Sequence, residues 1–297
     1  MEAVYRPGTE TATELEVLTD LSAFSEPAAS EISERNAPTQ AEQQEMLGAA
    51  AKFFSVTLKH LPDFLAIRTT RSFEDVPVFT ADGSLQSGMH AIGTYEREVA
   101  FRNGREFATD ADSAGKADGA GNASRTAPSS AGEFGPVLAT IIADSAQGKV
   151  SWVRWERTAA GVLAVFRYAV PKEAAHYEIN FCCTWSAAKD GFESYQGQPA
   201  YHGTISVNPA SGEIVGLTLE ADFDNIEQPP RFGLVVRYGR VEIEGSSLVC
   251  PLRSAVVVRS TRQARNRTWN VVYVNGMTFT GYRRFGSTAH VVSNAAH

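Results

Sequence analysis

The side chains that carry out hydrolysis in enzymes are present in this chain, but the sequence does not group them. Its six histidines are scattered, and no Gly-x-Ser-x-Gly element is present. A nucleophilic serine needs a base within hydrogen-bonding reach, and that element is a common sign of the arrangement. His202, between Tyr201 and Gly203 at the start of a predicted strand, is the histidine we would test. A hydrogen-bonded strand-end histidine is the simpler interpretation. The sequence therefore favours a protein that is not an enzyme, with an unrecognised hydrolase as an alternative.

Cofactor and metal sites have no sequence support either. Gly115 to Gly121 is rich in glycine, yet it follows no predicted strand and opens no helix, as dinucleotide sites require. Cys182 and Cys183 are adjacent and Cys250 is distant, with no histidine or second cysteine pair at ligand spacing. A disulfide between Cys250 and either Cys182 or Cys183 would leave one free thiol. In the other interpretation all three cysteines are buried thiols that pack as small apolar groups. We expect no cofactor and no metal.

Large apolar side chains are the better candidates for a ligand site. Two stretches supply them, a short helix expected at residues 133–143 and a strand at 149–157. The candidate ligand-binding residues are Phe134, Leu138, Ile141, Trp152 and Trp155. Because side chains alternate along a strand, Trp152 and Trp155 are expected on opposite faces of the sheet, so only one of them can line the cleft. Core packing remains the alternative for both.

A basic stretch near the C-terminus is the second candidate site. Residues 231–284 contain ten arginines, no lysine and two glutamates, a net charge of +8. Candidate contacts with an anionic partner are Arg259, Arg262, Arg265 and Arg267, around a predicted loop. An anionic surface or the chain's own acidic N-terminus would be attracted in a salt-dependent way. A solvated loop and sheet face would explain the same residues. Nucleic acid is not expected, because the whole chain is acidic and has no stacking motif.

The elements that must position these residues are mainly strands. Alternating apolar and polar residues, separated by turn residues at regular intervals, predict an antiparallel meander, sandwich or barrel. The predicted strands are 64–73, 94–103, 149–157, 162–170, 176–186, 201–208, 213–223, 233–244, 247–259 and two more within 268–292. The fold class is therefore mainly β, or α+β. We expect one strongly curved antiparallel sheet or half-barrel, whose concave face two helices cover.

Turn residues refine this prediction at three places. Asn103-Gly104 and Asn275-Gly276 each predict a hairpin, since both central positions of a type I′ turn need positive φ. Between Tyr238 and Val241 the apolar alternation slips by one residue, which predicts a β-bulge at Gly239. Bulges and tight hairpins are typical of strongly curved sheets.

The helices and the loop complete the expected domain. A helix is predicted from about Ala41 to Leu61, with Met46, Ala50 and Phe53 on one stripe, and Pro62 ends it. The second helix, at 133–143, follows a flexible loop at 110–130 that is rich in Ala, Gly, Ser and Asp. Residues 41–292 are thus expected to form a single antiparallel β domain.

The N-terminal 40 residues are predicted to be an acidic, disordered tail. Residues 1–48 contain ten Asp or Glu and two Arg, a net charge of −8, and few large apolar residues. No stretch approaches the roughly 20 apolar residues that span a bilayer, so the chain is not expected to cross a membrane. It opens without a basic, apolar leader. A cytoplasmic protein, or a periplasmic or secreted one whose leader has been removed, are both consistent with this start.

Eight short blocks, spread in order over most of residues 60–290, carry a family resemblance. They are Leu61-Pro62-Asp63-Phe64, Arg68-Thr69-Thr70-Arg71, Gly132-Glu133-Phe134-Gly135, Trp152 to Trp155, Phe166 to Pro171, Tyr201-His202-Gly203, Cys250-Pro251-Leu252-Arg253 and Tyr282-Arg283-Arg284-Phe285. In these blocks the chain resembles a group of uncharacterised, envelope-associated bacterial proteins. Their sheet looks like the half-barrel of the outer-membrane lipoprotein carrier and sorting proteins.

The resemblance implies a function without catalysis. A curved sheet with helices over its concave face would leave an apolar cleft for a lipid, an acyl chain, or a lipidated or extended peptide. The first expectation is therefore a binding protein of the cell envelope. The alternative is an interaction or scaffold domain that uses the acidic tail and the arginine-rich stretch.

Overall fold

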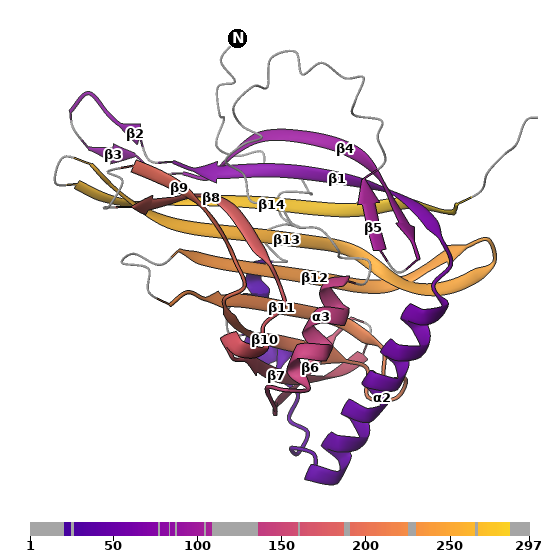
Figure 1. Ribbon diagram of the computed structural model, residues 1–297. Coiled ribbons are helices and arrows are strands. Elements are labelled where there is room, and N and C mark those ends of the chain that lie inside the picture. The colour runs from indigo at the N-terminus through magenta and orange to yellow at the C-terminus, as the bar shows by residue number, and fades with distance from the viewer. Residues whose placement is uncertain are drawn as a thin grey trace, which may run out of the picture.

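A computed structural model of the chain describes residues 21–24, 27–76, 78–82, 84–86, 88–103, 105–108, 136–159, 161–186, 191–224, 230–264 and 267–285 (Figure 1). The predicted loop at 110–130, most of the predicted acidic tail and Phe134 lie outside these residues. No helix of the described chain is long and apolar enough to cross a membrane.

Ten antiparallel strands form one large sheet, which confirms the predicted fold class. Their order is β5-β4-β1-β14-β13-β12-β11-β10-β7-β6, so the first long strand pairs with the last. The strands are β1 Phe64–Asp75, β4 His90–Arg102, β5 Arg105–Ala108, β6 Lys149–Thr158, β7 Gly161–Val170, β10 Ala200–Val207, β11 Ile214–Asp222, β12 Arg231–Ile243, β13 Ser246–Ala264 and β14 Arg267–Arg284. Two small hairpins, β2 Val78–Phe79 with β3 Leu85–Gln86 and β8 Ile179–Ser186 with β9 Gly191–Gly197, stand apart from this sheet.

The sheet is curved, and its two faces are covered differently. Helices α2 (Gln40–His60) and α3 (Pro136–Ser145) and the β8–β9 hairpin lie on one side, in front of the sheet in Figure 1. We call this side the inner face and the opposite side the outer face. The main core lies on the inner face, and its largest fully buried side chains include Tyr168, Tyr201, Phe64, Phe101 and Phe166.

Helix α2 begins and ends where local chemistry dictates. The Thr39 hydroxyl accepts a hydrogen bond from the backbone N–H of Glu42, and the Glu42 carboxylate accepts one from the N–H of Thr39, a complete capping box. Pro62, just beyond His60, cannot continue the helix. Met46 and Ala50, on the predicted stripe, are buried against the sheet.

Helix α3 is more apolar and more deeply buried than α2. Val137, Leu138 and Ile141 lie on one face of it and pack into the core on the inner face of the sheet, and the helix contacts β7. The helix predicted at 133–143 is therefore present, and the described part of it runs to Ser145.

The prediction that Trp152 and Trp155 face opposite ways is wrong. Opposite β7, Trp152 pairs with Phe166 and Arg154 with Val165, so Val153 is an extra residue in β6. This bulge changes the alternation by one position and turns both indoles toward the inner face. Their ring centroids are 4.8 Å apart, in an edge-to-face arrangement.

Two turn predictions near the C-terminus also change. Asn275-Gly276 does not form a hairpin, because β14 runs unbroken through it, with Asn275 opposite Val256 and Gly276 opposite Ala255. The backbone groups of a strand with neighbours on both sides all form hydrogen bonds to those neighbours. These hydrogen bonds outweigh the local turn preference of Asn-Gly. The bulge expected at Gly239 of β12 lies instead in β13, where Leu252 is the extra residue between Pro251, opposite Tyr238, and Arg253, opposite Arg237.

The described end of the predicted tail is held against the outer face. Leu21 packs with Phe73 and Val274, and Phe24 lies over Gly233 of β12. Ile32 then forms a β-bridge with Glu156 at the β6 edge. Residues 27–39 thus lead from the outer face around this edge to α2 on the inner face.

Candidate functional site: a pocket beside Trp155

A pocket of about 470 Å³ lies where the N-terminal segment, α2 and the rim of the sheet meet. Its lining residues come from four parts of the chain: the segment before α2, the first turns of α2, β6 and the turn between β10 and β11. They are Asn36, Ala37, Pro38, Glu42, Glu45, Met46, Ala49, Trp155, Pro209 and Ala210. Most of them are small or apolar, and the two charged ones are both acidic.

Trp155 is the large aromatic wall of this pocket, and hydrogen bonds fix its position. Its indole Nε1 donates to the carbonyl of Asn36 at 2.8 Å, and its own carbonyl accepts from the N–H of Ser33 at 3.0 Å. On the core side, Trp152 meets it edge-to-face and in turn meets Phe166, with ring centroids 5.5 Å apart. The bulge at Val153 makes this tryptophan corner possible.

The acidic wall of the pocket comes from the first turns of α2. Glu42 accepts from the Thr39 N–H at 2.7 Å and from the Thr39 hydroxyl at 2.8 Å. The hydrogen bond from the Thr39 backbone, followed by that from its hydroxyl, lowers the pKa of the Glu42 carboxyl. Glu45 lies one helical turn further along the same side of the pocket. The pocket therefore presents negative charge next to an aromatic ring.

A cation already lies on this ring. The guanidinium carbon of Arg35 is 5.4 Å from the centroid of the Trp155 ring, within the range of a cation–π contact. Arg35 belongs to the segment that leads into α2, so it reaches Trp155 from outside the sheet.

Of the predicted ligand-binding residues, the structure brings only Trp155 to this pocket. Ile141 is completely buried, and Leu138 is buried beside it in the core, so both pack α3 onto the sheet. Trp152 lies behind Trp155 and supports it. Phe134 lies outside the described residues. The pocket residues Asn36, Glu42 and Pro209 gave no sequence signal, because they come together only when the N-terminal segment wraps the edge of β6.

The predicted anion-binding residues are only partly described. Arg259 lies exposed on the outer face, directly opposite Arg231 of β12. Arg262 and Arg267 belong to β13 and β14, which extend much closer together than the predicted loop allowed, with Ala264 opposite Arg267. Nothing is described of the Arg262 and Arg267 side chains, and Arg265 lies outside the described residues.

A buried carboxylate with three hydrogen-bond donors lies at the end of α3. Asp144 accepts from the Tyr201 hydroxyl at 2.6 Å, from the His176 N–H at 2.8 Å and from the His176 ring Nδ1 at 2.7 Å. The hydrogen bond to Asp144 raises the pKa of His176, and burial, with the same carboxylate, raises that of Tyr201. The His176 side chain is 66% exposed, and none of the three residues lines the pocket. The cluster ties α3 to the segment between β7 and β8.

His202 does meet carboxylates, on the outer face. Its Nδ1 lies 2.9 Å from Asp222 and its Nε2 3.9 Å from Glu220, and all three side chains are at least 40% exposed. The residues that line the pocket include no histidine, serine or cysteine. The hydrolase alternative therefore gains no support from the pocket and stays a prediction.

Cys250 is buried and free, and burial raises the pKa of its thiol to about 12. The structure does not describe the side chains of Cys182 and Cys183. Among the described residues, no group of three His, Cys, Asp or Glu side chains is arranged to hold a metal ion.

Comparisons with known proteins do not assign a family. No family model matches the chain, and no curated protein matches it. Among solved structures, it is similar to a chain of the MucA/MucB complex of Pseudomonas aeruginosa, with 13% identity over 80% of this chain and 92% of that chain. The TM-score is 0.17, which does not establish a shared fold. The half-barrel of lipoprotein carriers therefore stays a resemblance of the sequence blocks.

Proposed function

We propose that the protein is a non-enzymatic binding protein that holds the apolar part of a ligand against Trp155. The observation that supports this most is the pocket of about 470 Å³ next to Trp155, whose indole donates one hydrogen bond and whose backbone carbonyl accepts another. Small-molecule sites in proteins enclose about 300–1,000 Å³ and combine apolar walls with a few polar groups. An aromatic wall that is already held in place does not have to be ordered when the ligand binds.

The walls of the pocket select for charge as well as for apolar surface. Met46, Ala49 and Ala210 offer apolar contact, while Glu42 and Glu45 make the pocket unfavourable for a carboxylate or phosphate. The contact of Arg35 with Trp155 shows that a cation is accommodated at this ring. We therefore expect an extended peptide with a basic side chain, or an apolar amine, rather than a fatty acid. A place in the cell envelope belongs to the same proposal and rests on the family resemblance.

A matched pair of probes tests this proposal. Dodecylammonium and dodecanoate have the same chain length and opposite charge, and calorimetry measures the binding of each to the purified, delipidated protein. We expect dodecylammonium to bind at least about tenfold more tightly, a difference of roughly 1.4 kcal/mol. Glu45→Gln should reduce that preference.

A blocking variant locates the site. Ala210 is exposed in the β10–β11 turn, so Ala210→Trp should fill the pocket without disturbing the core. Ala146→Trp is the matched control, because Ala146 is also exposed in a turn and does not line the pocket. Binding should be lost in the first variant and kept in the second. If neither probe binds the unmodified protein, or if Ala210→Trp binds as well as the control, the proposal is wrong.

A further inference from the structure

Residues 27–37, which we call the strap, contact the edge of the sheet at Trp155 and Glu156. Ile32 forms an isolated antiparallel bridge with Glu156, and the Ser33 N–H donates to the Trp155 carbonyl at 3.0 Å. Three residues further, the Asn36 carbonyl accepts from the Trp155 indole at 2.8 Å. Among the described residues, the hydrogen bonds between the strap and the sheet therefore both involve Trp155.

Little apolar surface secures the strap. None of its residues is fully buried, and its largest apolar side chain, Ile32, is 40% exposed. Arg35, which lies over the Trp155 ring, is exposed as well. Segments with few buried apolar contacts open at a much lower free-energy cost than the core does. The strap can therefore leave the β6 edge while the sheet stays folded.

The C-terminal end of the strap adjoins a part of the chain that is fixed independently of β6. The Pro38 carbonyl accepts from the Gln43 side chain at 2.9 Å, and Thr39 caps α2 through its reciprocal hydrogen bonds with Glu42. These contacts lie within α2 and its cap. Release of the strap thus turns the chain at Ala37, just before Pro38, and leaves the helix in place.

Two strap residues form part of the pocket beside Trp155. Asn36 and Ala37 line it, next to Pro38 at the fixed end. When the strap leaves the edge, the pocket loses this wall and the Trp155 indole loses its hydrogen bond. A ligand that touches both the ring and this wall binds more tightly when the strap is docked. Such differential binding couples the two equilibria.

We propose that the strap closes one side of the pocket, so that ligand binding and strap docking stabilise each other. The protein with a released strap is the low-affinity form, and the apparent affinity falls in proportion to the docked fraction. This inference rests on the proposed function, because it concerns the regulation of the same site. Any condition that holds the strap on β6 thereby increases the affinity of the pocket.

A proline variant weakens strap docking without changing a pocket residue. Ser33→Pro removes the N–H that donates to the Trp155 carbonyl, and Ser33 does not line the pocket. Ile32 already has the extended backbone that a residue before proline prefers. Ser33→Ala keeps the N–H and is the matched control. Calorimetry with dodecylammonium should show about three- to tenfold weaker binding for Ser33→Pro and unchanged binding for Ser33→Ala.

A disulfide tests the same coupling in the opposite direction. Ile32 and Glu156 stand opposite each other in an antiparallel bridge, where Cα atoms lie about 4.5–5.5 Å apart, within the span of a disulfide. In the variant Ile32→Cys/Ser33→Pro/Glu156→Cys, the oxidised protein should bind dodecylammonium about threefold or more tightly than the same protein after reduction. Peptide mapping by mass spectrometry identifies the bridge, because the chain has three other cysteines.

Hydrogen exchange gives the reciprocal measurement on the unmodified chain. Saturating dodecylammonium should slow amide exchange in residues 27–37. The coupling is wrong if Ser33→Pro binds as tightly as Ser33→Ala, if oxidation leaves the affinity of the cysteine variant unchanged, or if bound dodecylammonium leaves the exchange of the strap unchanged. Each of these results leaves the proposed function standing, since the probe still binds. If neither probe binds the unmodified protein, the proposed function is wrong and the coupling is wrong with it.

Discussion

Two glycines show how differently the two faces of the sheet are built. Gly203, on the inner face, lies under the Tyr168 side chain, whose hydroxyl crosses to donate to the Thr218 carbonyl at 2.6 Å. Gly233, on the outer face, lies under Phe24 of the N-terminal segment. The neighbours of Gly203 are backbone and a fully buried tyrosine, whereas those of Gly233 are the far end of the partly exposed Phe24 ring and one methyl group of Val257.

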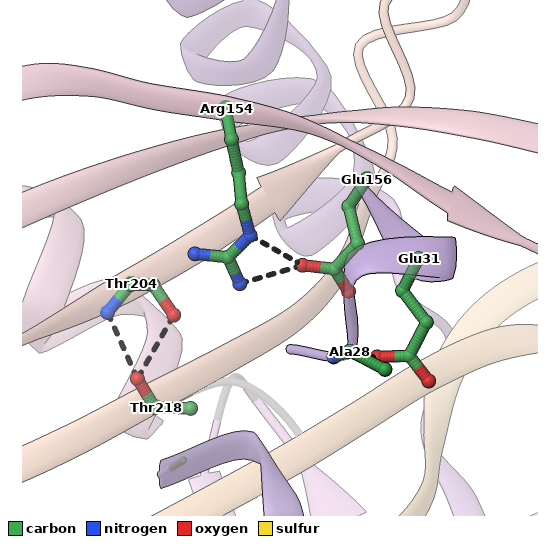
Figure 2. A network of polar contacts seen from close by, with 6 residues as sticks. All are labelled: Ala28, Glu31, Arg154, Glu156, Thr204 and Thr218. Atoms are coloured by element: carbon green, nitrogen blue, oxygen red, sulfur yellow. Dashed lines mark hydrogen bonds and ion pairs between the residues drawn. The ribbon is translucent and has the colours of Figure 1, made fainter. Parts of the chain in front are cut away.

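This difference separates a fixed face from a releasable one. Beside Gly203, on the outer side of β10 and β11, the Thr218 hydroxyl accepts from the Thr204 N–H at 2.9 Å (Figure 2). The inner face holds its contacts within the sheet and its two helices, since Tyr168 donates to the Thr218 carbonyl and Tyr201 donates to Asp144 of α3. The outer face is covered by a segment that enters from the N-terminus. In this segment the Ala28 N–H donates to the Glu31 carboxylate, close to the Arg154–Glu156 ion pair (Figure 2).

The largest expected effect is at the fixed glycine. In Gly203→Ala the new Cβ would overlap the Thr218 carbonyl oxygen and lie 2.8 Å from the Tyr168 hydroxyl oxygen. Overpacking of a core costs typically about 1–3 kcal/mol and more where backbone must move, so we expect a loss of at least about 3 kcal/mol. Urea denaturation followed by circular dichroism measures it. A loss below about 1 kcal/mol would contradict the view that this face is fixed.

The buried carboxylate of the inner face gives the next largest effect. Tyr201→Phe removes the hydroxyl that donates to Asp144 and leaves the ring packing in place. Hydrogen bonds to charged groups contribute about 1.5–3 kcal/mol, so we expect a loss of about 2 kcal/mol in the free energy of unfolding. The matched control is Tyr95→Phe, on an exposed tyrosine, which should change stability by less than about 0.5 kcal/mol. Equal effects of the two variants would show that the Asp144 contact contributes nothing.

The releasable glycine should tolerate the same substitution far better. In Gly233→Ala the Phe24 ring can swing away, so we expect a loss of about 1 kcal/mol or less. In the Phe24→Ala background the same substitution should cost less still, because only the Cγ1 of Val257, 3.1 Å from the new Cβ, then remains close. Urea denaturation of the two single variants and the double variant gives the coupling energy. A cost for Gly233→Ala that is unchanged in that background would mean that Phe24 does not pack over Gly233.

The helices and strands were easier to predict than the contacts between them. The periodic stretches gave β6, β7, β10 and α2 within about one residue at most ends, because each carries its own alternation or helical stripe. β9 was not predicted, since Gly191–Gly197 has glycine at both ends and no clear alternation. The bulge at Val153 was not predicted either, as it depends on pairing with β7, and that single residue decides where Trp155 points.

The candidate site was predictable only as single residues. Trp155 was recognised as an aromatic candidate, but its partner Asn36 is 119 positions away and carries no motif. Asp144 and Tyr201 are likewise 57 positions apart. In the sequence Asp144 indicates only the polar end of a helix. Contacts of this kind follow from the path of the N-terminal segment and from the order of strands, which a single sequence does not specify.

The smallest effect we predict is the pH dependence at the edge of the inner face. The hydrogen bond to Asp144 raises the pKa of His176 in the folded protein. A raised folded pKa contributes stability that is fully present below the unfolded value, near 6.5, and is lost as pH rises through the folded pKa. The groups that face His176 are Asp144 of α3 and, on the far side of that carboxylate, Tyr201 of β10. The stability difference between the wild type and His176→Gln should therefore shrink as pH rises from 5.5 to 8.5, as urea midpoints measure. Because the His176 ring is mostly exposed, salt should reduce this pH dependence. A stability difference between the wild type and His176→Gln that grows with pH would contradict the contact between His176 and Asp144.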